Sequence, residues 1–105
     1  MPRHENRRTP KTISGILYTD DAYTGTAVGS SAWFAWLNTA STFYYESRHG
    51  TFTAHRERRQ RGGLYWYAYR RHAGVLRRSY LGQAQHLTVA RLDSTAVILT
   101  PEPTR

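Results

Sequence analysis

Four segments rich in aromatic and β-branched residues, separated by glycine turns, dominate the middle of the chain and restrict the folds open to it. They cover residues 42–46, 51–59, 64–71 and 75–81. Glycines at positions 50, 62, 63 and 74 lie between them, and Gly82 follows the last. Such side chains favour strands, and short glycine-containing connections favour hairpins. The pattern therefore predicts an antiparallel meander of three or four strands.

Two helices are expected to flank this meander. Trp33, Trp36 and Leu37 are spaced i, i+3 and i+4, which is the pattern of a short amphipathic helix, and Ser30 precedes them as an N-cap. Thr88 caps a second apolar segment, which ends before the prolines near the C-terminus. We therefore expect an α+β fold in which a three- to four-stranded antiparallel meander packs against a short N-terminal helix and a C-terminal helix.

The length of the chain favours a single domain. With 105 residues it is too short for two stable cores, because small units bury too little surface. We expect residues 26–100 to form one α+β domain. Residues 1–25 hold several charges and few apolar side chains, so they are expected to form a basic, loosely ordered arm. Residues 101–105 are expected to be a loose tail.

Several classes of function are excluded by residues that the chain lacks. It has no cysteine, which excludes disulfides and cysteine-based zinc sites and fits a reducing compartment. No stretch approaches the roughly 18 to 20 apolar residues that span a bilayer. The five histidines show no paired ligand spacing, and no nucleophile or phosphate-loop motif occurs. We expect a cytoplasmic protein that is not an enzyme and has no metal, cofactor or membrane partner.

Positive charge is the strongest functional signal in the sequence. Lys and Arg number 15 against seven Asp and Glu, a net charge of +8, and 14 of the 15 cations are arginine. A domain this basic attracts polyanions, whose released counterions drive association. Arginine also makes bidentate contacts with phosphate and guanine. Nucleic acid is therefore the expected partner.

Most of this charge is concentrated in the predicted sheet. Between His55 and Arg78 there are eight arginines and a single acid, Glu57. Because strand side chains alternate between faces, Leu64, Trp66 and Ala68 can face the helices while three tyrosines between and beyond them face solvent. An open arginine and tyrosine face can contact phosphates, sugars and base edges. The candidate nucleic-acid-binding residues are Arg56, Arg58, Arg59, Arg61, Tyr65, Tyr67, Tyr69, Arg70, Arg71, Arg77 and Arg78.

A family resemblance rests on three consecutive motifs. Residues 50–71 read GTFTAHRERRQRGGLYWYAYRR, residues 76–82 read LRRSYLG, and Leu87-Thr88 follows. This region, about residues 50–99, resembles the small sheet-plus-helix domains of integrase arm-binding and plant AP2 type. It is also similar to short bacterial segments found alone or beside LuxR/MalT-type transcriptional regulators. The helix and strand expected before residue 50, and the lack of a following catalytic domain, depart from the integrase pattern.

The resemblance implies a mode of binding and a set of residues. A three-stranded sheet backed by one helix would lie in the major groove of duplex DNA, in transcription regulation or in a mobile element. Alternate residues of a strand face opposite sides of the sheet, so the arginines that face DNA would be one of two alternating sets. Both sets stay open, because a bulge in the long second strand would exchange the two faces. The two sets are Arg56, Arg58, Arg70 and Arg77, or Arg59, Arg71 and Arg78.

The sequence thus predicts a DNA-binding protein that uses an arginine- and tyrosine-rich sheet face. Two alternatives remain open. Tyrosines beside arginines also suit unpaired bases, which would make the protein an RNA or single-strand binder. A basic sheet edge could instead recruit an acidic protein partner or pair with a second copy of the chain as a homodimer.

Overall fold

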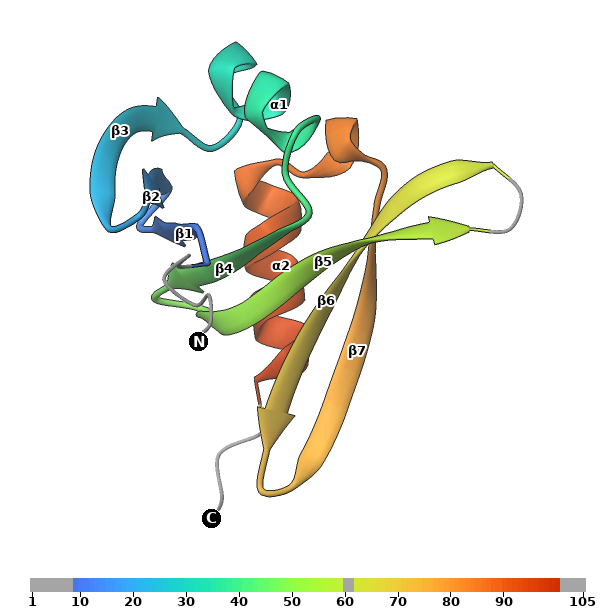
Figure 1. The fold of residues 1–105 in the computed structure, drawn as a ribbon. Helices are drawn as coiled ribbons and strands as arrows, with labels where there is room; N and C mark the ends of the chain where they lie inside the picture. The colour runs from blue at the N-terminus through green and yellow to red at the C-terminus, as the bar shows by residue number, and fades with distance from the viewer. Residues whose placement is uncertain (1–8, 60–61, 101–105) are drawn as a thin grey trace, which may run out of the picture.

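The computed structural model describes residues 9–59 and 62–100, which form a mixed β-sheet with helices packed against it (Figure 1). The sheet has seven strands in the order β3-β2-β1-β4-β5-β6-β7. β1 is parallel to β4, and the other neighbouring strands are antiparallel. The elements in chain order are β1 (Lys11–Ile13), β2 (Ile16–Thr19), β3 (Ala22–Ala27), α1 (Ser31–Leu37), β4 (Thr42–Ser47), β5 (Gly50–Arg59), β6 (Gly63–His72), β7 (Val75–Gly82), the short 3₁₀-helix η1 (Ala84–His86) and α2 (Val89–Leu99).

The predicted fold class is wrong in the size and type of the sheet. The four aromatic-rich segments form β4 to β7, but three more strands extend the sheet beyond β4 and make it mixed. The short helix α1 lies between β3 and β4, so it does not stand at the N-terminal end of the fold as expected. The parallel pairing sets Lys11 beside Tyr44, two residues far apart in the sequence. Local periodicity carries no signal for such a contact.

The expected loose arm over residues 1–25 also needs correction, because β1, β2 and β3 lie within or begin in it. Two tight turns connect these strands, one at Ser14-Gly15 and one at Asp20-Asp21, and all four residues have positive φ. Two-residue turns of this kind match the twist of antiparallel strands and therefore close hairpins. Leu17 is buried in the core, which ties the hairpins to the rest of the fold. Residues 1–8 and the expected tail at 101–105 lie outside the described part of the chain.

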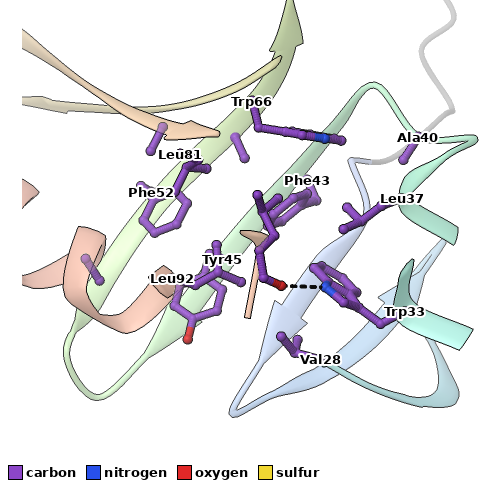
Figure 2. Packing of buried hydrophobic residues seen from close by; sticks show 14 of the residues in the cluster. Val28, Trp33, Leu37, Ala40, Phe43, Tyr45, Phe52, Trp66, Leu81 and Leu92 are labelled. Atoms are coloured by element: carbon purple, nitrogen blue, oxygen red, sulfur yellow. Dashed lines mark hydrogen bonds between the residues drawn. The ribbon is translucent and has the colours of Figure 1, made fainter. Parts of the chain in front are cut away.

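The hydrophobic core lies between one face of the sheet and α2 (Figures 1 and 2). Strand side chains in it include Phe43, Tyr45, Phe52, Trp66 and Leu81, and α2 contributes Leu92, Ala96 and Leu99. α1 closes one end of this core through Trp33, whose indole Nε1 donates to the carbonyl oxygen of Leu87 at 2.9 Å (Figure 2). The hydrogen bond satisfies the polar atom of a fully buried ring and fixes α1 to the segment before α2.

Both α-helices begin at a side-chain cap. Ser30 Oγ accepts from the backbone N–H of Trp33 at 3.2 Å, and Thr88 Oγ1 accepts from that of Arg91 at 3.2 Å. Each cap satisfies one of the free donors at a helix start. Within the described ranges, no helix has both the length and the apolar character needed to cross a membrane.

The N-terminal hairpins can be tested as part of the cooperative fold. Replacing Leu17, which is 2% exposed, by Ala should lower the free energy of unfolding by about 2–5 kcal/mol, because it leaves a cavity in the core. Ile98→Ala is the matched control, since Ile98 is 64% exposed and its loss should change the free energy by about 0.5 kcal/mol or less. Urea denaturation measures both values. Equal, small effects would mean that β2 does not pack on the core.

Candidate nucleic-acid interface

The register of β5, β6 and β7 decides which side chains face away from α2. Ala54 pairs with Ala68 and both are fully buried, so these two residues, and every second residue from them along their strands, face the helix. The next pair along the strands, His55 with Tyr67, therefore lies on the opposite face. We call this opposite side of β5 to β7 the open face. β7 continues the alternation, since Tyr67 pairs with Tyr80.

The three candidate tyrosines all belong to the open face. Tyr65, Tyr67 and Tyr69 alternate along β6 with Trp66 and Ala68, which are buried beneath the helices. On the two flanking strands the open face also carries His55, Glu57 and Tyr80, which were not among the candidates. Alternation along the segments 51–59 and 75–81 could have identified them, because they share the parity of the tyrosines once the hairpins are paired.

The candidate arginines divide between the two faces. Arg71 and Arg78 share the parity of the tyrosines, and both are exposed. The other face of the sheet, on the α2 side, carries Arg56, Arg58, Arg70 and Arg77. Arg59 pairs with Gly63 at the end of β5, but its side chain is outside the described part of the structure, as is the whole of Arg61. The structure therefore brings only some of the predicted arginines together.

Two arginines on the α2 side are engaged with the protein itself. Arg56 donates from Nη1 to the carbonyl oxygen of Asn38 at 3.2 Å, at the end of α1. Arg70 donates from Nη1 to the carbonyl and hydroxyl oxygens of Thr51, at 3.1 and 2.7 Å. These bonds tie β6 and α1 to β5. They assign Arg56 and Arg70 a structural role within the sheet.

A network of four side chains from three strands organises the open face. Arg78 on β7 donates from Nε to the Tyr69 hydroxyl at 3.2 Å and from Nη2 to Glu57 Oε1 at 3.5 Å. Tyr69 in turn donates to Glu57 Oε2. The guanidinium carbon of Arg78 lies 4.0 Å from the centroid of the Tyr67 ring, in cation–π contact. We call Glu57, Tyr67, Tyr69 and Arg78 the Arg78 network.

The Arg78 network raises the pKa values of two of its side chains, and both changes favour the protonation states that its hydrogen bonds need. The pKa of the Tyr69 phenol is raised, chiefly by the hydrogen bond that it donates to the Glu57 carboxylate and less by desolvation. The hydrogen bond from Arg78 to Tyr69 raises the pKa of the guanidinium. At neutral pH the phenol is therefore a neutral donor and the guanidinium a cation, as the hydrogen bonds require.

The aromatic rings of the open face pack against one another. Ring centroids are 5.5 Å apart for His55 and Tyr69, 5.4 Å for Tyr67 and Tyr80, and 6.2 Å for Tyr65 and Tyr80. Tyr67 is only 8% exposed. The rings thus form two packed clusters, one of His55 with Tyr69 and one of Tyr65, Tyr67 and Tyr80. Arg78 links them, because its guanidinium carbon lies 4.0 Å from the Tyr67 centroid and 5.9 Å from the Tyr69 centroid.

A second polar cluster lies on the other side of the sheet, where α2 meets the β4–β5 hairpin. Tyr45 donates to Asp93 Oδ1, and His49 Nε2 lies 3.9 Å from Asp93 Oδ2. The three residues line a cavity of about 410 Å³ together with Ser14, Gly15, Ser47, Arg48 and Val89. Desolvation, reinforced by the hydrogen bond to Asp93, raises the pKa of Tyr45. The cluster thus joins α2 to the β4–β5 hairpin.

Comparisons of the chain with models of protein families, with curated proteins and with solved structures gave no match. Within residues 9–59 and 62–100, no group of three or more His, Cys, Asp or Glu side chains is placed to hold a metal ion. The arrangement of the open face is therefore the basis for assigning a function.

The Arg78 network predicts a measurable change at Tyr69. Glu57→Gln should lower the pKa of the Tyr69 phenol, because the carboxylate that stabilises its protonated form is removed. NMR titration of protein carrying ¹³C at the tyrosine ζ carbon measures the change. Glu46→Gln removes another exposed carboxylate of the sheet and should leave the Tyr69 titration as in wild type. An unchanged Tyr69 titration in Glu57→Gln would show that the hydrogen bond does not form.

The Tyr45–Asp93 contact predicts a pH dependence of stability. The unfolded chain loses its Tyr45 proton near pH 10, whereas the raised pKa keeps that proton in the folded state. The contribution of Tyr45 to stability is therefore complete below about pH 10 and falls as the pH rises further. Tyr45→Phe should reduce the alkaline decline in the free energy of unfolding by about 1.4 kcal/mol per pH unit. Denaturation at a series of alkaline pH values tests this, and identical slopes would contradict it.

Proposed function

We propose that the protein binds duplex DNA with the open face of β5, β6 and β7. The observation that carries the proposal is the placement of Arg71, Arg78 and the candidate tyrosines on the one sheet face that α2 leaves uncovered. A sheet of two or three strands has the width to enter the major groove of B-form DNA. The exposed arginines would contact phosphates and base edges there.

The charge of the chain supports a polyanionic ligand. The net charge is +8, and Glu57 is the only acid between His55 and Arg78. Arginines that neutralise phosphates release condensed counterions, so binding should weaken steeply as salt rises. Two of the candidate arginines, Arg56 and Arg70, donate to the protein instead, and the proposal does not use them.

The packing of the aromatic rings favours a duplex over a single strand. Single-strand binding relies on rings that are free to stack on unpaired bases. On the open face Tyr67 lies beneath Arg78, and the neighbouring rings contact each other edge-on or tilted. Rings packed in this way leave few free faces for unpaired bases, whereas the exposed Arg71 and Arg78 offer cationic donors to a groove. We therefore place duplex DNA ahead of RNA and single strands.

The resemblance to integrase arm-binding and AP2-type domains supports the same proposal. Those domains are expected to present three strands to DNA and to cover the other face with one helix. Here α2 packs on β5, β6 and β7, within a sheet that also contains β1 to β4. A role in transcription regulation or in a mobile element follows from the resemblance alone and belongs to the proposal. The cytoplasmic location expected from the cysteine-free sequence belongs to it as well.

Two neighbouring arginines on opposite faces allow a direct test. In fluorescence-anisotropy titrations with a random duplex, Arg71→Ala should weaken binding and reduce the slope of log affinity against log salt by about 0.9, the loss of one phosphate contact. Arg77→Ala is the matched control, because it removes the same charge from the α2 side of the same hairpin. Arg77 is exposed there, and the β6–β7 hairpin extends past the end of α2 (Figure 1).

Three outcomes would count against the proposal. Equal losses in Arg71→Ala and Arg77→Ala would indicate attraction by net charge without a defined face. Tighter binding to a single strand or an RNA hairpin than to the duplex would assign the open face to those ligands. No binding to any of the three nucleic acids would indicate a protein partner.

A further inference from the structure

We infer that Arg78 reads a guanine in the major groove and that Glu57 and Tyr69 are its positioning residues. The inference rests on the proposed DNA-binding function and adds base specificity to it. Its basis is the geometry of the Arg78 network, in which a carboxylate and a phenol hold one side of the guanidinium while the Arg78 side chain stays 53% exposed.

The donors of Arg78 are divided between the protein and the solvent. A guanidinium has five N–H donors in a rigid plane, and Nε–H points the same way as one N–H of Nη2. This side of the group is occupied, because Nε donates to Tyr69 and Nη2 to Glu57. The second N–H of Nη2 and both of Nη1 point away from the network. Nη1 and Nη2 together form the end-on fork, whose two parallel donors match the O6 and N7 acceptors of guanine.

The surroundings of Arg78 hold the fork in place without burying it. The Arg78 side chain is 53% exposed, and the Glu57 side chain is 37% exposed. The guanidinium rests on the Tyr67 ring, which is itself packed against Tyr80. A free arginine loses much rotamer freedom when it binds, whereas one held in advance loses less. The network therefore prepares Arg78 for a ligand with a fixed geometry.

The carboxylate in the network favours a base edge over a phosphate. Glu57 lies beside the guanidinium, with Oε1 3.5 Å from Nη2, so its negative charge opposes an approaching phosphate. Guanine presents neutral acceptors and is opposed much less. A site that bound only phosphate would gain affinity if Glu57 were absent. Glu57 therefore serves to orient the Arg78 guanidinium, since its charge cannot help to attract DNA.

The experiment begins with selection of duplexes from a library with a random core by the wild-type protein. In the selected duplex, each guanine is then replaced in turn by 7-deazaguanine, which lacks the N7 acceptor and leaves the phosphates unchanged. At one guanine this should weaken wild-type binding by roughly 5- to 150-fold. Arg78→Ala should bind the two duplexes equally, so the double-mutant cycle should be strongly non-additive. Arg77→Ala should keep the full discrimination of wild type.

Glu57→Gln separates base reading from phosphate binding, because the two predict different changes in discrimination. It removes a negative charge from the open face, so affinity for a random duplex should rise. It also replaces one carboxylate oxygen by an NH₂ donor, so only one of the two oxygens that accept from Tyr69 and Arg78 remains. The orientation of Arg78 should therefore weaken, and discrimination against 7-deazaguanine should fall. If the affinities for both duplexes rise by the same factor and discrimination persists, Glu57 is not a positioning residue and the inference is overturned.

The outcomes distinguish this inference from the function on which it depends. Failure of wild-type protein to bind any duplex overturns the proposed function and the inference with it. Duplex binding with no enriched guanine, or with equal sensitivity to 7-deazaguanine in wild type and Arg78→Ala, overturns the inference alone. Because the 7-deazaguanine substitution is in the DNA, its effect on wild-type binding does not depend on the folding of any variant.

Discussion

The packing of α2 against β4 to β7 is the constraint on which the rest of the structure depends. A helix can lie close to a sheet only where small side chains allow it, and Ala54, Ala68 and Ala96 are all fully buried here. The approach is also tight at Gly50, where an added Cβ would lie 2.3 Å from Thr100 Oγ1 and 3.0 Å from the Ala96 carbonyl oxygen. Once this face is covered, strict alternation assigns every second residue of β5 and β6 to the other face.

The open face gains its chemistry from this assignment. Glu57, Tyr69 and Arg78 come from three different strands, and they meet only because Glu57 pairs with Tyr65 and Tyr69 with Arg78 in the register. A slip of one residue in either hairpin would move one member of the network to the helix side. The same packing that forms the core thus fixes the geometry of the proposed DNA contact.

Much of β4 to β7 was predictable because its signals are local. The aromatic and β-branched segments, the turn at Ala73-Gly74 and the caps at Ser30 and Thr88 act over a few residues, and each corresponds to a feature of the structure. The strands β1 to β3 were missed because they are short and bury few side chains, Thr12 and Leu17 being the buried residues among them. Their turns at Ser14-Gly15 and Asp20-Asp21 were the available signal, and the parallel pairing with β4 had none.

The sequence by itself determined the strand segments, the alternation of tyrosines with apolar residues on β6, and the concentration of arginine in one region, since each depends on residues close together in the chain. The tertiary structure decided which arginines share the tyrosine face, because strand register and the position of α2 are properties of distant contacts. It also placed Glu57, the one acid among these arginines, where it accepts hydrogen bonds from Tyr69 and Arg78. A charge count cannot show this, because the strength of such an interaction depends on distance and direction in space.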